Sequence, residues 1–126
     1  MYGDDPATAQ ARYPENFEII RQAFFQDEVS FQGKHISIER FPVRMHPLQR
    51  PHPPLWYATT KPDSAPWAAQ NGANVMTLGS IDNARLVSER YREEWQRLGR
   101  EPGALPNIGI TRHVVVNGRR YITGDV

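Results

Sequence analysis

The chain has 126 residues, of which 39% are hydrophobic, and a net charge of +1 from 15 basic and 14 acidic side chains. This composition is that of a globular protein, and its balanced charge argues against nucleic acid or an anionic membrane as a partner. Without cysteine, the chain has no disulfide and no thiolate metal site. It shows no signal segment and no run of 18 apolar residues, so we expect a soluble, cytoplasmic protein.

The first predicted element is a helix over residues 6–26, in two pieces. Pro14 begins the second piece, because a proline ring cannot continue the helical hydrogen-bond ladder but suits a first turn. In this piece Phe17, Ile20 and Phe24 recur at helical spacing, with polar residues between them. The second piece is therefore predicted to bury one apolar face.

Residues 28–54 are predicted to form a short β-hairpin insertion and a proline-rich lead-in. Apolar and polar residues alternate on either side of Gln32-Gly33, which is typical of two strands joined by a turn. Prolines recur from Pro42 to Pro54 and favour extended backbone for themselves and for the residues before them. Such a segment either stiffens the approach to the next strand or serves as a recognition segment for aromatic grooves.

Short apolar runs then alternate with helical segments. Strands are predicted at residues 55–59, 74–78 and 108–116. Because helical segments separate them, the fold class is predicted to be α/β, with parallel strands adjacent in chain order and joined by right-handed crossovers. In the atypical tail, residues 117–126, Asn-Gly between apolar flanks indicates a hairpin.

Two helices are predicted between these strands. The first begins at Asp63 or Ser64, either of which can cap it, and ends at Gly72. The second begins near Asp82 and ends at Gly99. The residues expected at near-helical intervals along the second helix are Leu86, Tyr91 or Arg90, Trp95 and Leu98.

Four polar residues lie where the first of these strands meets its helix, in the stretch "ATTKPDSA". Thr59 and Thr60 end the strand, and Asp63 and Ser64 begin the helix. Ligands of parallel α/β sheets sit beyond the carboxyl ends of the strands, where hydroxyls and first-turn amides favour a phosphate. The alternative is that Asp63 or Ser64 only caps the helix and the threonines bond to their own backbone.

Other residue groups favour packing over chemistry. The four histidines, at positions 35, 46, 52 and 113, include no pair spaced four residues apart on a predicted helix, so no metal site is predicted. Arg112 and His113 are expected on opposite faces of the last strand. Adjacent helical positions place Glu93 and Glu94 in solvent, without a glycosidase-type carboxylate pair. Packing also accounts for the aromatic residues Trp56, Tyr57, Trp67 and Trp95.

Four stretches in this order resemble a known family: "QAFFQDEVSFQGKHISI", "PLQRPHPPLWYATTKPDSAPWAAQNGANVM", "YREEWQRLG" and "IGITRHVVV". The proline-led strand, the small polar turn followed by "WAAQNGA", and the helix and hairpin before them carry the likeness together. Over roughly residues 8–116 the chain is similar to the flavin-dependent bacterial luciferase-like monooxygenases.

The resemblance implies a TIM (β/α)₈ barrel, with this span corresponding to the helix after strand four, an insertion, and strands five to seven. Members of the family bind reduced flavin mononucleotide (FMN), usually delivered by a separate flavin reductase, and use it with O₂ to oxygenate a small-molecule substrate. Some relatives use a deazaflavin instead. The turn after strand five helps to hold the flavin phosphate, which makes Thr59, Thr60, Asp63 and Ser64 the expected cofactor-binding residues.

The resemblance does not include strands one to four or strand eight, and it ends after Val116. We therefore expect residues 1–126 to form a single partial barrel domain that contributes to the flavin phosphate site and is inactive alone. Its unpaired strand edges predict self-association, with a homo-oligomer as the expected state. The alternatives are a non-catalytic truncated barrel and a proline-rich protein-interaction module.

Overall fold

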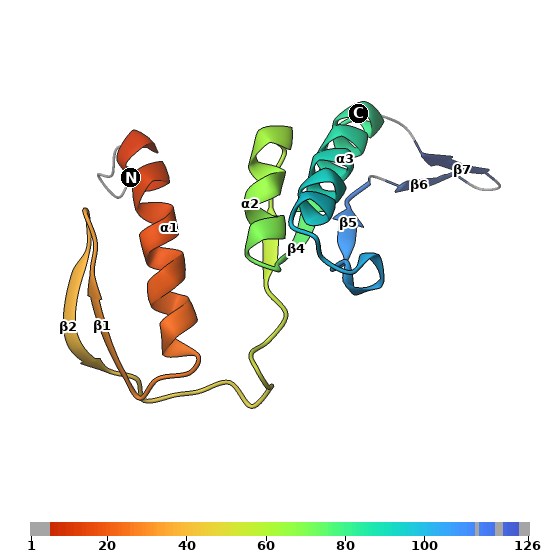
Figure 1. The fold of residues 1–126 in the computed structure, drawn as a ribbon. Helices are drawn as coiled ribbons and strands as arrows, with labels where there is room; N and C mark the ends of the chain where they lie inside the picture. Colours follow the sequence, from red (N-terminus) through yellow and green to blue (C-terminus); the bar gives the residue numbers. More distant parts are fainter. Residues whose placement is uncertain (1–5, 113, 118–119, 124–126) are drawn as a thin grey trace. The chain divides into compact units, whose positions relative to one another are not determined.

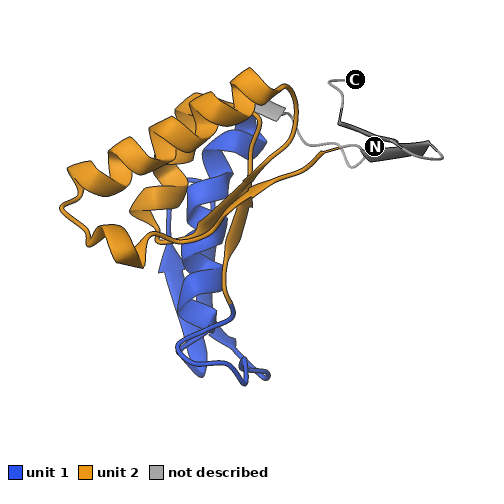
Figure 2. Cartoon of the chain, turned by 90° about the vertical axis from the view of Figure 1, so that its right-hand side faces the viewer, with its two compact units in different colours: residues 1–53 blue, residues 54–126 orange. Residues whose placement is uncertain are grey.

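The computed structural model describes residues 6–112, 114–117 and 120–123. The chain divides into two compact units, residues 1–53 and 54–126, which Figure 2 colours separately. The prediction of one partial barrel domain over the whole chain stays a prediction.

In the first unit, helix α1 (Pro6–Ala23) precedes an antiparallel hairpin of β1 (Glu28–Gln32) and β2 (Ser37–Pro42). The prediction of a helix in two pieces was wrong, because α1 runs without a break through Pro14. A proline inside a helix removes one amide donor, and here the ladder resumes beyond it. The helix also ends at Ala23, where Phe24 and Phe25 close a turn by bonding to the Arg21 and Gln22 carbonyls.

The predicted hairpin is confirmed, and a hydrogen bond of 2.8 Å from the Gly33 amide to the Ile36 carbonyl closes its turn. The proline-rich segment packs within this unit: the His52 ring stacks on Phe24 at 5.4 Å and meets the edge of Phe25 at 5.9 Å. Because His52 packs against the residues that follow α1, the proline-rich segment is not free, which does not favour its alternative role as a recognition segment for aromatic grooves.

The second unit contains a three-stranded parallel sheet of β3 (Trp56–Ala58), β4 (Asn74–Thr77) and β5 (Ile108–Ile110), in that order. The 3₁₀ turn η1 (Pro62–Ser64) and helix α2 (Ala65–Gln70) join β3 to β4. Helix α3 (Ile81–Arg97) and the turn η2 (Pro102–Ala104) join β4 to β5. The predicted parallel pairing and strand order are therefore confirmed (Figure 1).

The predicted strand over residues 108–116 was wrong, because it is two strands. β4 ends at Thr77, and its last hydrogen bond with the neighbouring strand segment comes from the Thr111 amide, which donates to the Thr77 carbonyl at 2.9 Å. Beyond Thr111 the chain has no further β4 residue to pair with. Residues further along form β6 (Val114–Asn117), which pairs antiparallel with β7 (Arg120–Thr123). The predicted tail hairpin is confirmed by this pairing, although residues 118–119 and His113 lie outside the described residues. Arg112 lies between β5 and β6, not within a strand.

The core of the second unit lies between the sheet and its two helices. Three alanines of α2 (Ala65, Ala68 and Ala69) pack against Val75 of β4 and against Val87, Tyr91 and Trp95 of α3. The small alanine side chains let the helices lie close together, side by side (Figures 1 and 2).

The buried stripe of α3 differs in part from the predicted one. It contains Val87, Tyr91 and Trp95, spaced four residues apart, whereas Leu86 and Leu98 are exposed. The Tyr91 hydroxyl donates to the Ala73 carbonyl at 2.7 Å, and burial raises the pKa of this phenol to about 12.

Two further predictions of exposure and packing were wrong. Trp56 is 51% exposed, because it points away from the helices. Glu94 is only 8% exposed, because it faces α2 and accepts a hydrogen bond from Gln70 at 2.7 Å. Glu93 is exposed, as predicted.

Both predicted helix-ending glycines are confirmed. Gly72 and Gly99 have φ values of 64° and 66°, in the left-handed region that favours glycine. After Gly72, the Ala73 amide bonds back to the Ala68 carbonyl at 3.0 Å, which closes α2 and turns the chain into β4.

Candidate functional site

The three parallel strands end at one edge of the sheet. Because β3, β4 and β5 run in the same direction, the segments that follow them lie at the same edge. These segments begin with Thr59 after β3, Leu78 after β4 and Thr111 after β5. We call this region the carboxyl edge, and all four predicted cofactor-binding residues lie in its first segment.

Thr59 shapes the turn that leaves β3. Its amide continues the sheet ladder by donating to the Met76 carbonyl at 2.9 Å. Its hydroxyl accepts the Lys61 amide at 3.0 Å and lies 3.4 Å from the Lys61 carbonyl. The side chain of Thr59 therefore bonds to the backbone two residues later, the local pattern in which threonine stabilises a turn.

Thr60 presents a hydroxyl at the carboxyl edge. The residue is exposed, and its hydroxyl has no hydrogen-bond partner among the described residues. Its backbone carbonyl accepts the Asn83 side-chain amide at 3.0 Å, which ties the turn after β3 to the first turn of α3. The backbone at Thr60 is thus fixed while its hydroxyl is available.

Neither Asp63 nor Ser64 caps α2 with its side chain, so the predicted cap was wrong. η1 runs directly into α2, and Ser64 has a helical backbone with φ −91° and ψ −15°, not the extended one of a capping residue. Pro66 has no amide, which removes one of the donors that a cap would satisfy. The Ser64 hydroxyl is half-buried and, within the described part of the chain, without a partner. Asp63 is exposed.

Three residues at the carboxyl edge were not among the predicted site residues: Ser80, Asn83 and Arg112. Asn83 holds Thr60, and its own amide donates to the Ser80 hydroxyl at 3.2 Å, so Ser80 is the side-chain cap of α3. Arg112 donates to the Gly79 carbonyl at 2.8 Å and to the Thr111 carbonyl at 3.2 Å. In the sequence, Ser80 could have been identified as a helix cap, because serine is a common capping residue just before a helix. Arg112 could not be placed, because the predicted strand over residues 108–116 was too long and included it.

The charges at this edge are mixed. The Arg112 guanidinium and the exposed Lys61 are positive, and the exposed Asp63 is negative. Asp82 is also exposed but lies 3.3 Å from the Arg85 guanidinium, which offsets its charge. This edge therefore carries hydroxyl donors after β3 and a guanidinium after β5 that is held by two carbonyls, and groups of both kinds suit an oxyanion.

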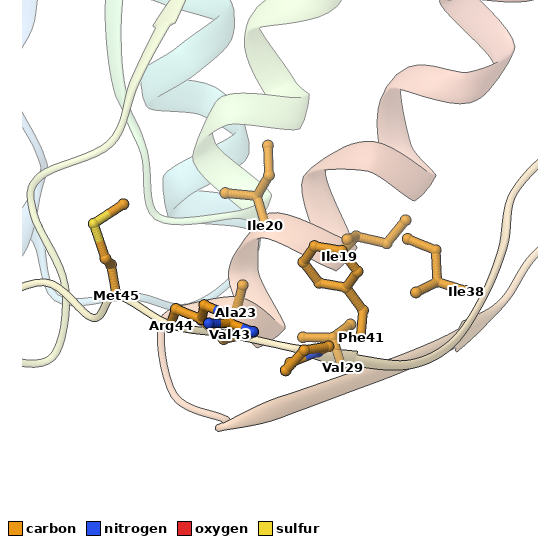
Figure 3. Close-up of a pocket in the computed structure, with 10 residues that line it drawn as sticks. Ile19, Ile20, Ala23, Val29, Ile38, Phe41, Val43, Arg44 and Met45 are labelled. Atoms are coloured by element: carbon orange, nitrogen blue, oxygen red, sulfur yellow. The ribbon is translucent and has the colours of Figure 1, made fainter.

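A separate apolar pocket lies within the first unit (Figure 3). Its volume is about 640 Å³, and it lies between the side chains of α1, the hairpin and the segment after the hairpin. Ile19, Ile20 and Ala23 line it from α1, and Phe41 and Met45 from the other side. Its one charged lining residue is Arg44.

The described residues contain neither a cluster suited to a metal ion nor a helix suited to a membrane. No cluster of three or more histidine, aspartate or glutamate side chains in that part of the chain is arranged to hold a metal ion. None of its helices has the length and apolar character needed to cross a membrane.

Comparison with known proteins gives one family and a consistent set of relatives. The family model for luciferase-like monooxygenases matches residues 1–120. The uncharacterized protein y4wF of Sinorhizobium fredii is 41% identical over 116 residues, which are 91% of this chain and 34% of that protein.

Two solved structures are similar to the chain. The monooxygenase RslO1 from Streptomyces bottropensis has a TM-score of 0.71 and 26% identity, over 86% of this chain and 34% of that one. An F420-dependent secondary alcohol dehydrogenase, solved with an F420-acetone adduct, has a TM-score of 0.70 and 18% identity, over 87% of this chain and 34% of that one. The second likeness is one of fold alone.

The chain thus spans about one third of the length of these relatives, since it covers 34% of each. Its mixed α/β fold, with a parallel sheet and helices, is similar to that of the matched part of luciferase-like enzymes. The match over nearly its whole length identifies the chain as a member of the luciferase-like monooxygenase family.

Proposed function

We propose that the chain is part of a luciferase-like oxidoreductase that uses reduced FMN and O₂ to oxygenate a small organic substrate. The family match and the 26% identity to a monooxygenase support this proposal. The F420-dependent neighbour leaves a deazaflavin as the other cofactor that the fold accommodates. In this proposal the chain contributes to the cofactor phosphate site, and a separate flavin reductase supplies the reduced cofactor.

We also propose that the sheet is an arc of a (β/α)₈ barrel. Its three strands follow one another in chain order, and each is joined to the next through a helix. Repetition of this unit around a closed ring is the architecture of such barrels, whose ligands bind at the carboxyl ends of the strands. The carboxyl edge is then the rim of the active site.

The observation that carries the proposal is the pair of hydroxyls without partners on Thr60 and Ser64. Both follow one strand at the carboxyl edge, and both can donate to phosphate oxygens together with the Asp63 backbone amide. Pro62 has no amide hydrogen, and the Ser64 amide donates to the Lys61 carbonyl. Thr59 fixes the turn through Lys61. The Asp63 carboxylate would repel a phosphate, so its proposed contribution is the backbone amide.

The bound flavin would supply the redox chemistry, and the residues of this chain would hold its phosphate. Arg112 contributes positive charge from the end of β5, held in place by the Gly79 carbonyl. This arrangement favours a dianionic phosphate over a neutral hydroxyl at the same position.

The test uses a chimera in which this chain replaces the matched segment of the Sinorhizobium fredii relative. Changing Thr60→Ala and Ser64→Ala together should weaken FMN binding by a few kcal/mol, on the order expected for two charge-assisted hydrogen bonds, and leave riboflavin binding nearly unchanged. Fluorescence titration with both ligands measures this difference.

Ser37→Ala in the same chimera is the matched control, because Ser37 is a hydroxyl in the hairpin that bonds only to Gln32. It should alter neither affinity. If the double variant weakens FMN and riboflavin equally, or weakens neither, the hydroxyls are structural and the phosphate assignment is wrong.

A further inference from the structure

The apolar pocket of the first unit has the size of a small-molecule site. Its volume is about 640 Å³, within the range of roughly 300–1,000 Å³ that is typical of ligand pockets. Side chains of α1, of both hairpin strands and of the segment after β2 line it (Figure 3). These lining residues all belong to the first unit, so the pocket is formed within one compact part of the chain.

The walls of this pocket favour a flat apolar ligand. Isoleucine, valine and alanine side chains make up most of the lining. The Phe41 ring and the Met45 thioether add two large side chains that stay exposed to solvent. Aromatic rings pack well on another ring and against a polarizable sulfur, so these two residues suit a ligand with an aromatic ring.

Arg44 is the one charged side chain among the described residues that line the pocket. It is exposed, and its guanidinium has no ion-pair partner in the described part of the chain. A guanidinium can donate two parallel hydrogen bonds to one carboxylate. A free guanidinium beside apolar walls therefore favours a ligand that is apolar at one end and carries a carboxylate at the other.

The backbone on both sides of Arg44 is held by Asp27, the residue before β1. The Val43 amide donates to the Asp27 carbonyl at 2.8 Å. On the other side of Arg44, Nε2 of His46 lies 3.0 Å from Oδ1 of Asp27. The segment that carries Arg44 is thus tied down at two points, and the Asp27 carboxylate is engaged by His46 and not by the guanidinium.

We propose that this pocket binds an aromatic monocarboxylate, with the ring against Phe41 and the aliphatic side chains and the carboxylate on Arg44. Charge complementarity selects this class, because the described lining offers one cation and no anion. A phosphate dianion fits less well, since a single guanidinium would face two charges beside apolar walls. The site lies in the unit that does not contain the carboxyl edge, so it is additional to the proposed function.

The probe is a naphthalene carboxylate, and the reference ligand is the corresponding carboxamide, which has nearly the same shape but no charge. Fluorescence titration of the 126-residue chain without flavin gives both dissociation constants. The carboxylate should bind about tenfold more tightly than the carboxamide, the order expected for one charge-assisted contact at an exposed guanidinium.

Variants of Arg44 test whether its charge makes this difference. Arg44→Gln should weaken the carboxylate about tenfold and leave the carboxamide nearly unchanged. Arg44→Lys keeps the charge and should retain most of the preference for the carboxylate. Arg92→Gln is the matched control and should change neither affinity, because it removes the same charge from an exposed position of α3 in the other unit.

A charge placed in the wall tests whether the ligands occupy the pocket. Ile20 lines the pocket from α1 and is 53% exposed, so Ile20→Glu leaves the fold intact while it puts a carboxylate beside the ligand. Both ligands should bind at least about tenfold more weakly. Ile81→Glu is the control, since Ile81 is 62% exposed on α3, and circular dichroism of all variants checks that the fold is retained.

Three outcomes would overturn the inference. The first is equal affinity of the unchanged chain for the carboxylate and the carboxamide. The second is a loss of carboxylate binding in Arg92→Gln as large as that in Arg44→Gln. The third is a folded chain that binds neither ligand and sediments as a dimer that Ile20→Glu dissociates, because a second copy of the chain would then occupy the pocket.

Discussion

Among single residues, Glu94 shows how a charge is held near the core of the second unit. Its carboxylate accepts two hydrogen bonds from Arg97, both at 2.6 Å, and one from Gln70 at 2.7 Å. The bonds from Arg97, then the bond from Gln70, lower the pKa of Glu94 to about 2 against partial desolvation. The carboxylate thereby links α3 to the last residue of α2.

The Glu94 link predicts a stability that depends on pH. Because the pKa is lowered in the folded chain, the contribution is present above the ordinary value of 4.5 and is lost as the pH falls toward 2. Glu94→Gln should therefore lower the urea midpoint at pH 7 and should have little effect near pH 2. Unfolding of both proteins across this range measures the difference, and a constant difference would contradict the assignment.

The sequence predicted where the candidate site residues lie along the chain, but not the contacts that they make. Thr59, Thr60, Asp63 and Ser64 follow an apolar run, and that pattern is enough to place them at a strand end. The absence of a Ser64 cap depends on η1 and on Pro66, and the Asn83 contact to Thr60 spans 23 residues. Such contacts depend on tertiary structure, which no local pattern encodes.

Among the elements, one carboxylate of α1 accepts three backbone amides from the turn of the hairpin. Glu15 accepts the amides of Lys34 and Ile36 at 2.9 Å each, and of His35 at 3.1 Å. Desolvation raises its pKa, but these backbone hydrogen bonds outweigh it and the pKa is lowered overall. A β-carbon on Gly33 would collide with this carboxylate and with Phe31, so a larger residue there would displace one or both side chains.

Removing the Glu15 carboxylate should release the hairpin turn. In Glu15→Ala we expect amide hydrogen exchange at Lys34, His35 and Ile36 to become about tenfold faster, because each amide loses its acceptor. Glu18→Ala is the control, since Glu18 bonds to Arg21 and Gln22 within α1 only. Unchanged exchange in Glu15→Ala, or equal acceleration in both variants, would show that the carboxylate does not hold the turn.

The errors at the element scale have physical causes. Pro14 costs a single hydrogen bond in a helix of 18 residues, and the sequence pattern overstated that cost. The run from 108 to 116 is rich in β-branched residues, but the length of a strand is set by its partner, and β4 has four residues. Residue propensity correctly predicted the first segment as helix and the second as strand. The end of the strand was determined by its pairing with β4.

At the scale of the whole molecule, the alternation of strands and helices predicted the parallel sheet and its order. Alternating short strands and helices favour that arrangement because crossovers are right-handed and short. The sequence did not predict which side chains face away from the helices, so Trp56 was assigned to the core. That side chain lies on the sheet face opposite the helices and is 51% exposed.

The most direct test of the account compares FMN with riboflavin in the chimera that carries this chain. These ligands differ only in the phosphate, so the ratio of their dissociation constants isolates the carboxyl edge from the rest of the flavin site. With a phosphate site at the end of β3, FMN should bind at least about 100-fold more tightly than riboflavin, as several charge-assisted hydrogen bonds require. Equal affinity for the two ligands would contradict a phosphate site at the end of β3.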